Sequence, residues 1–432
     1  MNTKFALLLC GILVLSGCDT EYLNPSAASQ NQVVTDPLGL VTLANGLQYK
    51  YSVTQLSPNY TVPTASGIVT GELTVTNAGN TGEENLRLGG GNVIGSNSVV
   101  TNLWNQSQLV RTNADLILDN LSIVTDQGLR GALQAHASIY KALALGNLAL
   151  FWERAPITSQ KNAPFVSRQD ILNRIIQLLE SAITELAKAP IPAAFTSRIV
   201  PGIEYNNTLN ALLARYALLA GDYDKALAAA NLVTLTSTSK STMNHDDASQ
   251  NALFFVSLSN RNVTEPVDAL FSLPTPLQTP TTDKRIAFFF NSAGGTGTIN
   301  RGRASFFTSN SSAIPIYRPG EVILIKAEAL ARKSTPDLAG AVAQLNLVLG
   351  KTPTNDALGI GADLPAYSGV VAAPEVLTEI YRQRCIELYL SGMRLEDSRR
   401  FNRPQSERTR NFFPYPFSER DNNTNTPADP AL

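Results

Sequence analysis

The stretch "NTLNALLARYALLAGDYDKALAAANLV", residues 207–233, has the pattern of two short helices joined by a tight turn. Gly221 can adopt the left-handed conformation that ends a helix, and Asp222 can cap the helix that follows. Small side chains let the two helices approach closely; they belong to Ala214, Ala217, Ala220 and Ala226. Closely packed helix pairs of this kind are typical of tetratricopeptide repeats.

A second predicted helix pair echoes the first, at residues 321–332 and 336–349. The tripeptide Asn-Leu-Val occurs in the second helix of each pair, at 231–233 and again at 346–348. Apolar residues at helical spacing also fill the segment that begins at Ser167, a residue suited to cap a helix. The sequence therefore contains an imperfect helical repeat.

Other parts of the chain are predicted to be rich in loops. Residues 234–312 are rich in Ser, Thr, Asn, Gly and Pro, and so long an insertion in a helical frame is more often functional than decorative. Residues 23–46 and 73–98 also have the composition of loops. We therefore predict a mainly α fold, a tetratricopeptide-like helical repeat scaffold with a loop-rich insertion. The expected segments are a signal peptide (1–17), a lipid anchor with a loop-rich N-terminal segment (18–98), a helical repeat region (99–233), an insertion that carries the candidate ligand face (234–312), and C-terminal helical repeats with a tail (313–432).

The N-terminus has the features of an export signal. Lys4 precedes an apolar run, residues 5–15, which is too short to span a bilayer but long enough for the core of a signal peptide. The run ends in Leu-Ser-Gly before Cys18, which resembles the bacterial lipobox, where the cysteine is lipidated and becomes the mature N-terminus. We expect lipidation at Cys18, and acyl chains would then hold the protein on a membrane. An ordinary signal peptide, with Cys18 incidental, is the alternative.

Composition argues against several other classes of protein. A net charge of −1 gives no sign of a nucleic-acid partner. If residues 1–17 are removed and Cys18 is lipidated, Cys385 is the only free thiol, so no disulfide can form within the chain. The two histidines, His136 and His245, lie far apart without ligand-like spacing, so we expect no metal or cofactor.

The stretch "RQRCIELYLSGMRLEDSRR", residues 382–400, raises the question of whether Cys385 is reactive. On a helical wheel Cys385 falls on the apolar face, without a nearby histidine to activate it, so we expect a small buried hydrophobe. Arg384 falls within the same stripe and needs a carboxylate partner. Glu387, three residues later, is the expected partner in a structural ion pair, and Asp397 or a neighbouring repeat could supply a second carboxylate.

Several motifs resemble those of the RagB/SusD family of nutrient-binding lipoproteins, and along the chain they occur in the family's order. The stretch 382–400 resembles the family signature "RxRxIELxxxGxRxxDxRR". "GDYDKALAAANLV" is similar to the family's repeat, and "RPGEVILIKAEALAR" to its "RLAEVYLIRAEA" helix. "AHASIYKALALGNLALFWERAPIT" resembles its first repeat helix and the turn that follows, and the segment from Tyr415 resembles its closing "PIPxxEIDxNPN" segment.

The resemblance implies a surface-exposed outer-membrane lipoprotein that captures a nutrient, either an oligosaccharide or a peptide. It also implies a partner, a TonB-dependent transporter of the SusC kind, over which such proteins sit as a lid, and it implies no catalytic activity. Two alternatives rest on other classes of function. One is a lipoprotein adaptor that binds another protein through its helical repeats, and the other is a glycan hydrolase that uses paired carboxylates.

Ligand-contacting residues are harder to predict. A sugar's apolar face stacks on flat aromatic rings, but Trp104 and Trp152 lie on predicted helices at positions that match scaffold aromatics of the family. Contacts are therefore expected from loops; the candidates are Tyr51, Tyr60, Arg301, Arg303, Phe306 and Phe307. The alternative is that these are ordinary loop residues, some solvated and some with their rings tucked inward.

Overall fold

The fold comes from a computed structural model, which describes residues 33–254, 263–291, 302–303 and 306–431. Cys18 and Arg301 lie outside the described residues. The long helices are α3 (Pro37–Ser52), α4 (Pro58–Val69), α6 (Ser98–Asp119), α7 (Gln127–Phe151), α8 (Arg168–Leu186), α10 (Tyr205–Ala220), α11 (Tyr223–Asn231), α13 (Pro319–Arg332), α14 (Leu338–Leu349) and α15 (Ala373–Glu387). Shorter helices are α5 (Thr81–Leu88), α9 (Ala193–Thr196), α12 (Lys284–Phe289), α16 (Arg394–Arg400) and α17 (Phe417–Asn422). The predicted mainly α fold is therefore confirmed.

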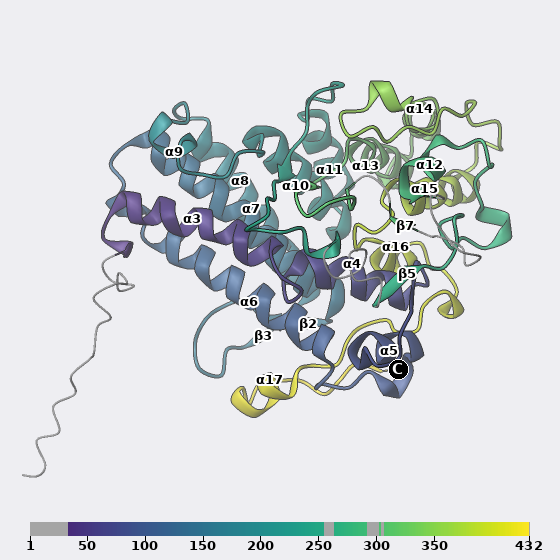
Figure 1. Cartoon of the computed structure of the whole chain (residues 1–432). Coiled ribbons are helices and arrows are strands. Elements are labelled where there is room, and N and C mark those ends of the chain that lie inside the picture. The colour runs from purple at the N-terminus through teal and green to yellow at the C-terminus, as the bar shows by residue number, and fades with distance from the viewer. Residues whose placement is uncertain (1–32, 255–262, 292–301, 304–305, 432) are drawn as a thin grey trace, which may run out of the picture.

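From α6 onward, most helices pack against helices that are close to them in the chain. α7 packs against both α6 and α8, α10 packs on α8, and α11 leads on to α13, which packs against α14 and α15. In Figure 1 the long helices α3, α6, α7 and α8 fill one end of the molecule, and α13, α14 and α15 fill the other. The frame is thus a stack of helix pairs, which is how short amphipathic helices bury a continuous core.

The predicted helix boundaries depend on local signals that the structure confirms. Ser167 and Asp170 form a capping box at the start of α8. Gly221 ends α10 in the left-handed conformation, with φ of 82°, and the Asp222 side chain accepts the Lys225 N–H to start α11. The second pair occurs where the repeat predicts it, as α13 and α14.

Short antiparallel ribbons tie the other segments to this frame. β1 (Leu73–Val75) pairs with β5 (Thr264–Pro266), and β2 (Arg154–Pro156) pairs with β3 (Phe165–Ser167). β4 (Thr242–Met243) pairs with β8 (Ile314–Pro315), and β6 (Phe290–Asn291) pairs with β7 (Gly302–Arg303). The β4–β8 pair brings the two ends of the insertion together, and the β1–β5 pair joins the insertion to the N-terminal segment.

The N-terminal segment contains more helix than the sequence predicts. The expected loop at residues 23–46 is wrong from Pro37 onward, because Asp36 caps α3 and Leu40, Val41 and Ala44 are buried on one face. The loop expected at 73–98 contains α5. α4 is buried along its whole length although it contains Pro63 and several hydroxyl side chains. The hydroxyls of Thr61 and of Thr70, which follows the helix, bond to backbone carbonyls one turn back, which offsets the cost of burying these two groups.

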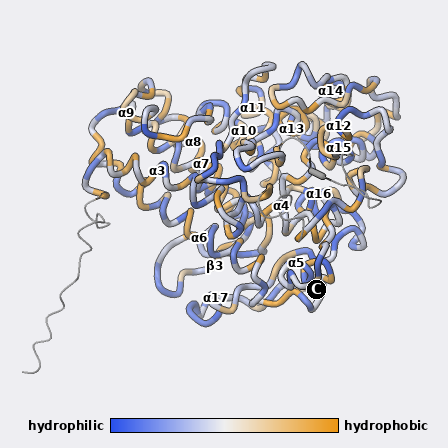
Figure 2. The backbone as a smooth tube through the Cα atoms, viewed as in Figure 1, coloured by the Kyte–Doolittle hydropathy of each residue, from blue (hydrophilic) through white to orange (hydrophobic). Residues whose placement is uncertain are grey.

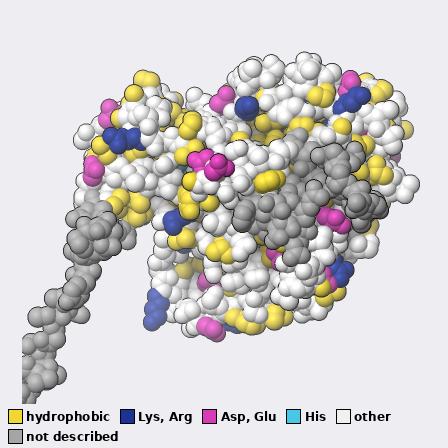
Figure 3. Space-filling view, in the orientation of Figure 1, with side chains coloured by type: hydrophobic (Ala, Val, Ile, Leu, Met, Phe, Trp, Pro, Cys, Tyr) yellow, Lys and Arg dark blue, Asp and Glu magenta, His cyan; other side chains and the backbone are white. Residues whose placement is uncertain are grey.

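The core follows the helices. One large cluster of buried apolar side chains runs from α3 to the C-terminal segment, and a smaller one lies between α13, α14 and α15. Figure 2 shows apolar residues recurring along the helices. On the face seen in Figure 3, acidic and basic side chains are scattered among polar and apolar ones.

Candidate functional site

The charged stretch at 382–400 is a buried structural element. The Arg384 guanidinium is 1% exposed and its Nε lies 2.9 Å from Asp397 Oδ2, with Glu328 also near it. Arg400 pairs with both of these carboxylates. Arg384 lies on α15, Asp397 and Arg400 lie on α16, and Glu328 lies on α13. The ion pairs therefore join α15 and α16 to α13.

The expected ion pair between Arg384 and Glu387 is wrong. Glu387 Oε1 instead lies 2.5 Å from Lys351 Nζ, and Oε2 lies 3.2 Å from Arg285 Nη1. Gly320 makes room for this orientation, because a Cβ there would come within 1.9 Å of Glu387 Oε1. Both partners of Glu387 come from outside its own helix, and helical spacing could not identify them.

Cys385 is structural, as the sequence predicts. Its side chain is 3% exposed and belongs to the main apolar cluster. Burial raises the pKa of the thiol to about 12, so the reactive thiolate does not form at neutral pH.

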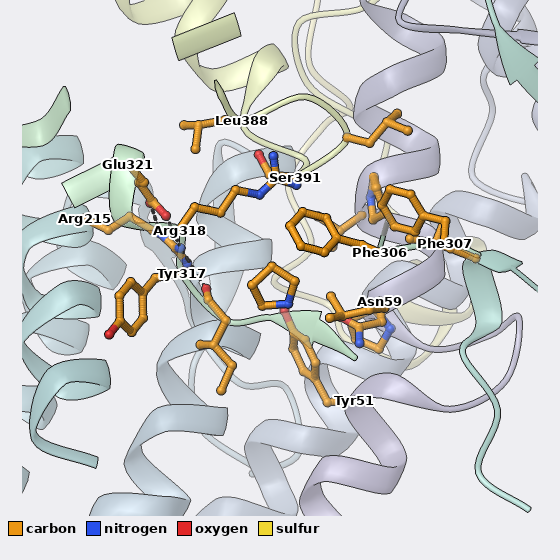
Figure 4. Close-up of a pocket in the computed structure, with 18 residues that line it drawn as sticks. Tyr51, Asn59, Arg215, Phe306, Phe307, Tyr317, Arg318, Glu321, Leu388 and Ser391 are labelled. Atoms are coloured by element: carbon orange, nitrogen blue, oxygen red, sulfur yellow. Dashed lines mark hydrogen bonds and ion pairs between the residues drawn. The ribbon is translucent and has the colours of Figure 1, made fainter. Parts of the chain in front are cut away.

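Three of the predicted ligand residues line one interior cavity, drawn in Figure 4. Tyr51 comes from α3, whereas Phe306 and Phe307 come from the insertion. The cavity measures about 70 Å³, far below the roughly 300 Å³ at which ligand pockets begin. The cavity is too small for a sugar ring and therefore does not support a ligand role for these three residues. That role stays a prediction.

The walls of the cavity anchor the insertion to the scaffold. Arg215 of α10 donates two hydrogen bonds to the Glu321 carboxylate of α13, of 2.5 and 2.8 Å, and also donates to the Ile316 carbonyl. Arg318 donates to the carbonyls of Glu387 and Tyr389, and its guanidinium lies 5.0 Å from the centre of the Phe306 ring. Figure 4 shows Arg318 extending from the Arg215–Glu321 pair toward the Phe306 ring.

Tyr60 does not join this cluster. Tyr60 is buried on α4, and its hydroxyl donates to Glu83 Oε1 at 3.0 Å. Arg303 lies on β7. The prediction that Tyr51 and Tyr60 lie in loops is wrong, because both are on helices that the sequence did not reveal.

A larger surface pocket opens beside the cavity, between the end of α3 and the start of the insertion. It measures about 300 Å³ and is lined by Asn45, Gln48, Tyr49, Ser52, Val53, Val200, Pro201, Asn244, His245, Asp246 and Ser249. We call it the Tyr49 pocket, because the Tyr49 ring is 51% exposed at its edge. Gln48 Nε2 donates to the Asn244 carbonyl and Asn244 Nδ2 donates to the Pro201 carbonyl, so the amides are held in place.

Sequence reasoning missed Tyr49, although a signal was present. The apolar residues of α3 recur at Leu40, Ala44, Leu47 and Tyr51, and Tyr49 falls off that stripe. An aromatic residue outside the apolar stripe of a helix is a candidate contact residue. The segment had to be recognised as a helix before that signal could be used.

The scaffold positions of both tryptophans are confirmed. Trp104 and Trp152 are buried and pack edge to face, with ring centres 4.9 Å apart. Within the described ranges, no group of three or more His, Cys, Asp or Glu side chains could hold a metal ion. No helix in that part of the chain is long and apolar enough to cross a membrane.

Comparison with known proteins identifies the architecture, a helical-repeat frame with an insertion tied across it. It is shared with a SusD superfamily protein of Bacteroides fragilis, at 18% identity and a TM-score of 0.67, covering 91% of this chain and 99% of that one. A SusD-like carbohydrate-binding protein of the same species gives 15% identity and a TM-score of 0.66, with 91% of this chain and 100% of that one covered. A SusD superfamily protein of Parabacteroides distasonis gives 16% identity and a TM-score of 0.66, with 92% of this chain and 98% of that one covered.

The sequence comparison gives the same answer for the C-terminal segment. Residues 302–429 match the model of the SusD family, and this range contains the charged stretch at 382–400. No curated protein matches the sequence. The resemblance to the RagB/SusD family is confirmed, and the chain has the SusD fold.

Proposed function

We propose that this protein is a lipid-anchored binding protein of the outer-membrane surface that captures an oligosaccharide and passes it to a TonB-dependent, SusC-like transporter. The observation that carries the proposal is the SusD fold over 91% of the chain, together with the SusD family match at residues 302–429. One of the structural neighbours is described as carbohydrate-binding. The protein binds and delivers its ligand without making or breaking bonds in it.

The N-terminal sequence supports the anchored location. An apolar run at 5–15 followed by Cys18 fits export and lipidation, and acyl chains at Cys18 hold the folded body at the membrane. Replacement of Cys18 by alanine is expected to move the protein from the membrane fraction to the soluble fraction. A Cys18→Ala variant that stays with the membrane would contradict the proposed anchor.

The Tyr49 pocket is the proposed ligand site. Its volume of about 300 Å³ reaches the range of small-ligand pockets. The exposed Tyr49 ring offers a flat apolar surface for a sugar face, and the amide and hydroxyl side chains around it suit sugar hydroxyls. The residues that line the pocket include no Lys or Arg, which favours a neutral sugar.

Calorimetry with the body that begins at residue 19 tests the ligand and the site together. We expect binding to at least one neutral oligosaccharide in a panel of plant, host and microbial glycans, and we expect Tyr49→Ala to weaken it by about tenfold, which is about 1.4 kcal/mol. Phe417→Ala is the matched control, because that ring is 48% exposed elsewhere on the surface. Equal losses in the two variants would argue against the Tyr49 pocket, and binding of peptides alone would replace the sugar by a peptide.

The proposed partner is tested separately. Affinity purification of the full-length protein from outer membranes is expected to recover a TonB-dependent transporter. Recovery of a different protein, with no glycan bound by the purified body, would favour an adaptor. Release of sugar from any glycan in the panel would show an enzyme instead.

A further inference from the structure

The largest pocket that we describe lies on the helical frame, away from the Tyr49 pocket. It measures about 470 Å³ and lies between α13, the end of α14, the loop that follows α14, and the first residues of the insertion. The two pockets have no lining residue in common. We call it the Lys326 pocket.

α13 provides one wall of this pocket with a single face. Pro319, Ile323 and Lys326 follow one another at spacings of four and three residues, so they lie along one side of the helix. Ile323 belongs to the apolar cluster beneath, and Leu347 of α14 is 55% exposed at the rim. The pocket therefore combines apolar surface with one ammonium group.

The ammonium group of Lys326 has no counter-charge among the described residues. The side chain is half-buried, and it makes no ion pair or hydrogen bond with another residue in the part of the chain that the structure describes. Burial lowers the pKa of Lys326, and no neighbouring carboxylate offsets this effect. A half-buried cation without a partner costs free energy that an anion in the pocket would recover.

The other charged groups around the pocket are already paired. Lys351 Nζ lies 2.8 Å from Asp356 Oδ2 and 2.5 Å from Glu387 Oε1. Asp356 also accepts the backbone N–H groups of Leu358 and Ile360 through its other oxygen. Lys326 is therefore the lining residue whose charge is available to a ligand.

Neutral polar groups complete the wall. Asn346 accepts the Tyr367 N–H through Oδ1, at 2.8 Å, which fixes the amide plane and leaves Nδ2 as a donor. Gln344 lines the same wall. Donors beside a cation and above an apolar floor suit a small molecule with a carboxylate at one end.

We propose that the Lys326 pocket binds a small carboxylate carried on a compact body, with Lys326 pairing to the carboxylate, Asn346 and Gln344 bonding to polar groups beside it, and Ile323 and Leu347 covering its apolar surface. The carboxylate can belong to an acidic sugar such as a uronic acid, or to a short carboxylic acid with an apolar chain. The pocket is independent of the proposed function, since it uses none of the residues of the Tyr49 pocket.

Titration of the body that begins at residue 19 with D-galacturonic acid, galactose and N-acetyl-leucine tests the proposal. We expect at least one of the two carboxylates to bind, and Lys326→Met to weaken that binding at least tenfold. Lys326→Arg keeps the charge and is expected to bind within a few fold of the original protein. Lys161→Met is the matched control, because it removes an exposed positive charge from the loop between β2 and β3.

The outcomes separate this pocket from the Tyr49 pocket. A galacturonic acid signal, with galactose silent, identifies an acidic sugar, and an acetyl-leucine signal identifies an apolar acid. Whichever carboxylate binds the original protein must also bind the Tyr49→Ala variant. Failure of both carboxylates to bind would overturn the proposal, and so would equal weakening by Lys326→Met and Lys161→Met, whatever the Tyr49 pocket binds.

Discussion

At the scale of single residues, Glu72 is a buried carboxyl group whose charge opposes folding. It is 1% exposed, and burial raises its pKa from about 4.5 to about 7, although the charges of Arg394 and Arg318 partly offset the effect. The folded protein therefore binds a proton that the unfolded chain releases between pH 4.5 and 7. Stability falls as pH rises through this window, by an amount on the order of 3 kcal/mol for this group.

Replacement of Glu72 by glutamine is expected to remove this pH dependence. Urea unfolding at pH 5, 6, 7 and 8 should give a shallower fall in the free energy of unfolding for Glu72→Gln than for the original protein. The slope will not vanish, because burial also raises the pKa of Asp397, to about 6. Parallel stability curves for the two proteins would contradict the assignment.

Loss of the Asp397 carboxylate is expected to lower the free energy of unfolding strongly. Asp397→Ala leaves the buried Arg384 and Arg400 without this carboxylate, and breaking a buried ion pair costs about 3–5 kcal/mol. Glu84→Ala is the control, because its pair with Arg87 lies at the surface and is worth at most about 1 kcal/mol. Chemical unfolding of both variants gives the comparison, and similar losses would show that the buried pair contributes little.

The sequence predicted that Arg384 needs a carboxylate, because the residue falls within an apolar stripe. It named Glu387 as the first partner, and Asp397 or a neighbouring repeat as the source of a second carboxylate; the carboxylates beside Arg384 are those of Asp397 and of Glu328 on α13. Asp397 follows thirteen residues later on another helix, and its position depends on the turn at Leu390 and Gly392, both of which have positive φ angles. Local spacing favoured Glu387, whose partners Arg285 and Lys351 come from distant segments.

At the scale of helices, two glycines with similar φ angles differ in the space around them. Gly221 has φ of 82° with open space around it, whereas Gly392 has φ of 88° with Val62 Cγ1 2.2 Å from the position of a Cβ. Gly221→Ala should cost about 1 kcal/mol, from backbone strain alone. Gly392→Ala should cost clearly more, because Val62 must also move. Thermal unfolding of the two variants measures the difference, and equal costs would show that the contact with Val62 is easily relieved.

Helices with strong local signals were predictable, and those stabilised by burial were not. α8, α10 and α11 carry caps and apolar spacing that the sequence displays. α3 contains Gly39 and Gly46, and α4 contains Pro63, and such residues are typical of loops. Their helical form is favoured by packing against α6 and α7, which come later in the chain. The Tyr49 pocket was missed for the same reason.

At the scale of the whole molecule, the insertion is bound to the frame from within. Arg285 of α12 is fully buried, and it bonds to Asp283 of the insertion and to Gln383 and Glu387 of α15. Together with the β1–β5 and β4–β8 ribbons, these bonds fix the insertion over the repeats. Sequence composition could mark the insertion, but not these contacts, because they join residues about 100 positions apart.

Replacement of Arg285 by methionine is therefore expected to loosen the insertion while the helix pairs stay folded. The variant leaves Asp283 without its partner and Glu387 with Lys351 alone. Limited proteolysis should cut the variant within residues 234–312 at least several times faster than the original protein, with helical circular dichroism unchanged. Arg130→Met is the control, because its pair with Glu185 is partly exposed on the helical frame. Faster cutting in the helical frame of Arg285→Met would mean that the residue supports the whole fold, and equal cutting rates would mean that the ribbons alone hold the insertion.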